Sequence, residues 1–82
     1  PFNPSTVISF DVAYESTINL SVYDIKGRLV EVLIYDIMVP GSYNFNYNAS
    51  ELSSGMYFVS FNAVKLNSTE SYKEVRKIVL LK

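Results

Sequence analysis

The chain has 82 residues, of which 49% are hydrophobic, and its seven basic and eight acidic side chains leave a net charge of −1. Neither cysteine nor histidine occurs, which excludes disulfides, thiolate metal ligands and the commonest general base. The positive and negative charges are mixed along the chain and form no basic patch that would bind nucleic acid. No apolar run approaches the roughly 20 residues that a transmembrane segment needs.

The length predicts one small domain, which we place at residues 1–82. The chain opens on Pro1 instead of methionine. We therefore expect it to be one module of a longer protein.

Six short runs alternate apolar and polar residues, a period of two that is typical of β-strands. In chain order they span residues 5–12, 17–24, 28–35, 42–48, 56–63 and 72–81. Turn-forming residues separate them, and only residues 49–53 could form a single helical turn, capped by Asn48. The pattern predicts an all-β protein built as an antiparallel sandwich.

The run at 28–35 is apolar on both faces, as expected of a central strand or of one that a partner covers. Its leucines, Leu29 and Leu33, are therefore candidates for a partner face.

The last run, at 72–81, does not alternate cleanly. If Val75, Ile78 and Leu80 all face inward, the spacing slips by one residue, and a bulge near Arg76–Lys77 would account for it. Two apolar side chains then face outward and join the candidate partner face, Val79 and Leu81.

The stretch "YDIKGRLV" at residues 23–30 places one glycine and two cations between apolar runs. A phosphate-binding loop would need more glycines and a following helix. A β-turn fits better, with Asp24 at its first position and Gly27 at its fourth, where φ is positive and the return strand begins with a bulge. Lys26 and Arg28 would then be solvated flanks.

No set of residues with catalytic or ligating chemistry emerges. The carboxylates are spread over different turns and strand faces, and the serines have no histidine partner. The alternating asparagines at 44, 46 and 48 suit the outer face of a strand better than a calcium loop. We predict that the domain is not an enzyme, with no catalytic, cofactor or metal site.

The tyrosines divide into two groups. Three lie on predicted inward faces, Tyr43, Tyr47 and Tyr57. Three others could be exposed and form a surface for sugar stacking or protein binding, namely Tyr14, Tyr23 and Tyr35.

Four motifs occur in order along the chain: "PFNPST", "VYDIKGRLV", "NASELSSGMYFVSF" and "KIVLLK". Together they resemble the C-terminal sorting domain of proteins exported by the type IX (Por) secretion system. They are also similar to the related Ig-like domain of the flagellar hook-capping protein. Those relatives usually carry Trp-Asp-Gly where this chain has Tyr47, Asn48 and Ala49, so the sorting branch matches better.

The resemblance implies a small antiparallel Ig-like β-sandwich of six to seven strands, the C-terminal module of a longer extracellular protein. Its role would be a non-catalytic sorting signal, without cofactor, that sends its parent protein to the cell surface or medium. The implied partners are the rest of the parent protein and the outer-membrane export machinery. The family motif maps onto Asn3, Pro4, Tyr23, Asp24, Gly27, Arg28, Leu52, Gly55, Tyr57, Lys77 and Lys82.

A second interpretation stays open on the residues alone. The domain could be a structural or binding accessory module of an extracellular protein that makes domain–domain, self-association or carbohydrate contacts.

Overall fold

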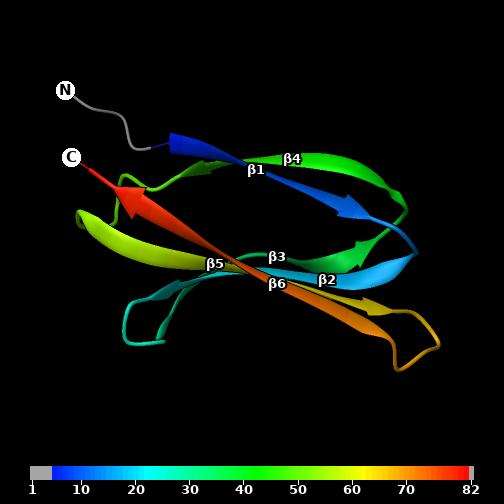
Figure 1. Ribbon diagram of the computed structural model, residues 1–82. Helices are drawn as coiled ribbons and strands as arrows, with labels where there is room; N and C mark the ends of the chain where they lie inside the picture. Colours follow the sequence, from blue (N-terminus) through cyan, green and yellow to red (C-terminus); the bar gives the residue numbers. More distant parts are fainter. Residues whose placement is uncertain (1–4, 82) are drawn as a thin grey trace.

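The computed structural model describes residues 5–81, which form six antiparallel β-strands and, within that range, no helix (Figure 1). The strands are β1 (Ser5–Val12), β2 (Ser16–Asp24), β3 (Leu29–Met38), β4 (Gly41–Asn48), β5 (Gly55–Lys65) and β6 (Ser71–Leu80). All six runs expected from the sequence are strands, and the all-β prediction is confirmed. The largest difference in bounds is at β3, which continues to Met38.

The strands form two stacked sheets of unequal width (Figure 1). One sheet contains only β1 and β4, and the other has the order β3-β2-β5-β6. The arrangement is consistent with a small Ig-like β-sandwich. The central strands β2 and β5 supply the middle of the core.

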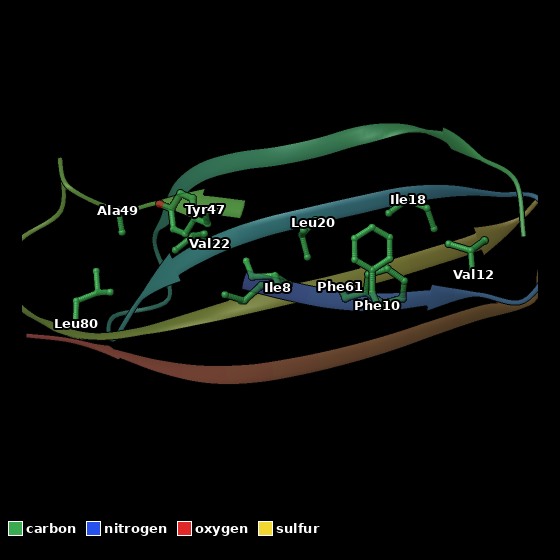
Figure 2. Close-up of a cluster of buried hydrophobic side chains, with 11 residues drawn as sticks. Ile8, Phe10, Val12, Ile18, Leu20, Val22, Tyr47, Ala49, Phe61 and Leu80 are labelled. Carbon is green, nitrogen blue, oxygen red and sulfur yellow. The ribbon is translucent and has the colours of Figure 1, made fainter. Parts of the chain in front are cut away.

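The core fills the space between the two layers (Figure 2). Alternate residues of β2 point into it, and Ile18, Leu20 and Val22 are fully buried, as the period of two predicts. The buried cluster comprises Ile8, Phe10, Val12, Ile18, Leu20, Val22, Tyr47, Ala49, Val59, Phe61 and Leu80. The three tyrosines predicted to face inward do contribute to the core, since Tyr47 is buried and Tyr43 and Tyr57 pack against the cluster.

Of the two alternatives for residues 28–35, a central strand or one covered by a partner, the first is wrong, because β3 is an edge strand beside β2. Two irregularities explain why it is apolar on both faces. In the pairing with β2, Leu33 and Val30 are each skipped, so β3 has two bulges. Both of these extra residues pack against the core, as does Ile34.

The bulge expected near Arg76–Lys77 is also wrong. The register between β5 and β6 runs without a break from Gly55 opposite Leu80 to Val64 opposite Ser71. Val75 therefore lies outward, with 53% of its surface exposed, and the inner face of β6 carries Glu74 and Arg76 instead. Charged side chains are tolerated there because that part of β6 lines the open flank of the sandwich beside β1.

The β2–β3 hairpin has the predicted turn. Gly27 N–H donates to the Asp24 carbonyl at 3.0 Å, Asp24 N–H donates to the Arg28 carbonyl at 3.0 Å, and Gly27 has φ +80°. One carboxylate oxygen of Asp24 accepts hydrogen bonds from the N–H groups of Lys26 and Arg28, each at 2.9 Å. Arg28 is more than a solvated flank, because its Nε donates to the other Asp24 oxygen at 2.9 Å.

The segment between β4 and β5 is a turn, and the single helical turn that residues 49–53 allowed does not form. Leu52 N–H donates to the Ala49 carbonyl at 3.0 Å, and the Asn48 side chain accepts from Ser50 N–H at 3.0 Å, so the expected cap is present without a helix. Leu52 packs against the core and covers that end of the sandwich.

Truncating the middle of β2 should weaken the fold strongly. We expect Leu20→Ala to lower the free energy of unfolding by about 2–5 kcal/mol, because it opens a cavity at a fully buried site. Ile37→Ala, on the exposed side of β3, is the matched control and should change it by only about 0.5 kcal/mol. Urea unfolding followed by circular dichroism measures both. Equal losses in free energy of unfolding for the two variants would contradict the assignment of Leu20 to the core.

The Asp24 carboxylate should make the hairpin sensitive to acid. The backbone N–H of Arg28, and then its guanidinium, hold the pKa of Asp24 below its ordinary value. The carboxylate therefore stabilises the fold above its ordinary pKa of about 3.9, and this stabilisation is lost as the pH falls through the lower folded value. Asp24→Asn should be less stable than the wild-type chain near neutral pH.

Urea unfolding from about pH 7 down to about pH 2 measures that difference across the transition. The difference in free energy of unfolding between the wild-type chain and Asp24→Asn should disappear at the acid end of this range. Glu51→Gln, an exposed carboxyl in the β4–β5 turn, serves as the control. A gap for Asp24→Asn that stays constant with pH would contradict the role of the charge.

Candidate functional site

The family-motif residues that the structure describes gather at one end of the four-stranded sheet. Asp24 lies opposite Tyr57 in the pairing of β2 with β5, and Gly55 lies opposite Leu80 in the pairing of β5 with β6. The β2–β3 hairpin, the start of β5 and the end of β6 therefore meet there, as Figure 1 shows. Three motif positions lie outside the described residues, Asn3, Pro4 and Lys82.

Several of these residues hold the backbone in place. Asp24 and Arg28 close the hairpin as described, and Gly27 supplies its positive φ. The hydroxyl of Tyr57 donates to the Ser53 carbonyl at 2.9 Å, which ties the β4–β5 connection to β5. These contacts are structural, and the surface that could meet a partner lies beside them.

That surface is the outer face of the four-stranded sheet, the side turned away from β1 and β4. The strand registers define its rows, in which Leu29, Tyr23, Phe58 and Lys77 follow one another across the sheet. More than half of the large exposed hydrophobic side chains of the described chain lie on it: Leu29, Val32, Tyr35, Ile37, Met56, Val64, Val75 and Val79. We call this the outer face. Contiguous exposed apolar patches are typical of interaction sites, which makes the outer face the candidate site.

The middle of the outer face is small and polar. Ser21 of β2 lies opposite Ser60 of β5, with Asn19 opposite Asn62 beside them. Ser21 donates a short hydrogen bond to the Asn19 side chain. The larger apolar side chains surround this polar centre, on the two edge strands and at both ends of β5. A hollow of about 400 Å³ opens near the hairpin, between Tyr23, Phe58 and Val75.

The charge of the outer face has one sign. Among the described strand residues that point outward there, Lys73 and Lys77 are charged and none is acidic. Both lysines stand on β6, beside Val75 and Val79. The outer face therefore combines exposed apolar side chains with a positive edge.

The residues proposed from the sequence as a partner face divide between two environments. Leu29 and Val79 lie on the outer face, at opposite edges of the sheet, and Leu81 follows β6 in an exposed position. Leu33 instead packs against the core.

The sequence reasoning missed Val32, Ile37 and Val75 as members of the outer face. Tyr35 was expected to be exposed and is, as is Tyr14, whereas Tyr23 is half-buried. Val32 and Ile37 were missed because β3 has two bulges, which no simple alternation reveals. Val75 was missed because β6 has a regular register where the sequence suggested a bulge, and plain alternation along β6 would have found it.

Two other features are absent from the described part of the chain. Residues 5–81 contain no group of three or more acidic side chains placed to hold a metal ion. No helix in that range is long and apolar enough to cross a membrane.

Comparison with known protein families gives one match. Residues 1–80 match the family described as "Secretion system C-terminal sorting domain". Comparisons with curated proteins and with solved structures give no match. Members of this family are non-enzymatic signals that send their parent proteins through type IX secretion to the cell surface or medium. Since the match covers almost the whole chain and agrees with the all-β fold, the chain belongs to the family of secretion system C-terminal sorting domains and is a non-catalytic sorting signal.

Proposed function

We propose that the outer-membrane export machinery recognises the folded domain through the outer face of the four-stranded sheet. The observation that carries this proposal is the concentration of exposed apolar side chains there, because eight of the 14 large exposed hydrophobic residues of the described chain lie on this one face. Burial of that area against a partner would supply most of the binding free energy, because such burial contributes about 25 cal/mol per Å².

The proposed mechanism is docking without chemistry. No bond is made or broken by the domain, and we propose that it is no enzyme. The apolar residues of β6, Val75 and Val79, would meet a complementary surface, while Lys73 and Lys77 favour a partner that is acidic at that edge.

The family-motif residues support the proposal by their positions. Tyr23 and Lys77 stand in one row of the outer face, and the Asp24–Arg28 pair fixes the hairpin that holds Leu29 beside them. We extend the same role to Asn3, Pro4 and Lys82 on the resemblance alone.

We also propose that the 82 residues act as a single Ig-like module at the C-terminal end of a longer extracellular protein. The similarity to the Ig-like domain of the hook-capping protein reflects a common fold family.

Two charges placed on the outer face should block export. We expect Val75→Glu combined with Val79→Glu, in the full parent protein, to abolish most delivery to the surface or medium, because it places carboxylates where an apolar surface must be buried. Cell fractionation with quantitative mass spectrometry measures the delivered fraction. Deleting the whole domain gives the reference for complete loss.

The chain offers a closely matched control. Val7→Glu changes a valine of β1 that is 58% exposed, against 53% for Val75 and 56% for Val79, but lies on the opposite side of the sandwich. Thermal unfolding of the isolated variants confirms that all remain folded. Normal export of the double variant would overturn the assignment of the outer face. Normal export after deletion of the domain would overturn the sorting role itself.

A further inference from the structure

A second candidate surface opens on the flank of the sandwich between β1 and β6. The two-stranded sheet is too narrow to cover the inner face of β6, so a cleft of about 590 Å³ remains between the layers. This volume lies in the range of small-molecule sites, roughly 300–1,000 Å³. The β1–β2 loop and the β5–β6 hairpin close one end of the cleft.

The floor of the cleft is already buried and offers a ligand little surface. Phe10 and Phe61 pack against each other with ring centroids 5.2 Å apart, and each is almost wholly removed from solvent. The exposed side chains stand on the rim, where Tyr14 is 56% and Tyr72 is 58% exposed. A ligand in this cleft would therefore contact the two tyrosine rings of the rim and little of the buried floor.

The rim is held in position by contacts between its parts. Tyr72 packs edge-on against Phe61 at 6.3 Å, and its hydroxyl donates to Glu74 at 3.2 Å. Lys65 Nζ lies 4.1 Å from the centre of the Tyr14 ring. At the closed end, Leu66 N–H donates to the Glu15 carbonyl at 3.1 Å, which joins the two loops.

The charges of the rim are largely compensated. Arg76 Nε bonds Glu74 at 2.9 Å, and Lys65 Nζ lies 4.0 Å from Glu70. The hydrogen bond from Arg76 holds the pKa of Glu74 below its ordinary value, so this carboxylate stays charged near neutral pH. The rim thus presents hydrogen-bond donors and acceptors without requiring an ion, which favours a neutral polar ligand.

A peptide strand is the weaker alternative for this cleft. It would have to pair with the outer edge of β1, but Arg76 Nη1 already donates to the carbonyl oxygen of Ser9 at 3.1 Å. The inner face of β6 also offers Glu74 and Arg76 where an added strand would need apolar neighbours.

We propose that this flank is a carbohydrate-binding site, in which the apolar face of a neutral sugar ring stacks on Tyr72 or Tyr14 and its hydroxyls bond Glu70, Glu74 and Arg76. Sugars combine an apolar face with neutral polar edges, and exposed aromatic rings flanked by paired charges match both features. The site lies away from the outer face and is independent of the sorting role.

Titration of the isotope-labelled 82-residue chain with cellotetraose, maltotetraose and mannotetraose tests the proposal by nuclear magnetic resonance. At least one of them should shift the amide signals of residues 13–15 and 65–76, with a Kd of about 1 mM, typical of roughly 4 kcal/mol of binding. Tyr72→Ala should weaken that binding about tenfold or more, in line with the loss of a stacking contact.

Two further variants separate binding from folding. Tyr72→Phe keeps the ring and should bind nearly as well as the wild-type chain. Tyr35→Ala removes a still more exposed tyrosine from the outer face, 72% against 58% for Tyr72, and should bind unchanged. The absence of shifts with all three sugars at about twentyfold the expected Kd would overturn the proposal. So would shifts that map to the outer face, or a folded Tyr72→Ala variant that binds as well as wild type.

Discussion

A sheet of two strands can cover only part of a sheet of four, and the cleft on the flank of the sandwich follows from this inequality. Strands in a sheet lie about 4.8 Å apart, so β1 and β4 span one spacing where the opposing sheet spans three. The central strands β2 and β5 lie in the region of overlap, and the inner apolar side chains of β2 are the most deeply buried. On one flank the uncovered strand is β6, and its inner face turns from apolar at Ile78 and Leu80 to charged at Arg76 and Glu74. The inner face of β6 is therefore charged on the flank that the two-stranded sheet leaves open.

The outer face reflects a different requirement. A sheet that faced only water would alternate apolar and polar residues with the polar set outward. Here the outward positions of β3 and β6 keep valine, leucine, isoleucine and tyrosine, and their charged members are lysines. The family to which the chain belongs gives such a surface a use, because a sorting signal must be recognised from outside. These side chains are exposed and lie outside the core, and the proposed recognition by the export machinery gives them a role.

Sequence reasoning recovers the parts of this structure that depend on local rules. The hairpin at Asp24–Arg28 was predictable because its turn chemistry is contained within five residues. The strands were predictable from the period of two, and so was the inward face of β2.

The order of the strands was not predictable, since the sequence of β3 is typical of a central strand but β3 lies at an edge. Its two bulges place consecutive apolar residues on the core side, and a bulge is set by the partner strand as much as by its own residues. The prediction for β6 is wrong for the opposite reason, because it places a bulge where the strand is regular and Val75 is simply exposed. Neither the outer face nor the flanking cleft could be assembled without the registers that join distant strands.

The pairing of β1 also has a consequence for how the domain folds and opens. The β2–β3 and β5–β6 pairs are each local hairpins, whereas β1 pairs only with β4, across a separation that takes Ser5 to Asn48. Loop closure over such a separation costs more entropy than closing a hairpin. The two hairpins can therefore form before either long-range pairing, that of β1 with β4 or that of β2 with β5. In the two-stranded sheet each strand has only one hydrogen-bonded neighbour, whereas β2 and β5 each have two. In native-state hydrogen exchange, the amides that join β1 to β4 should form the least protected cooperative unit of the sandwich. These two strands would then be the first to leave the fold.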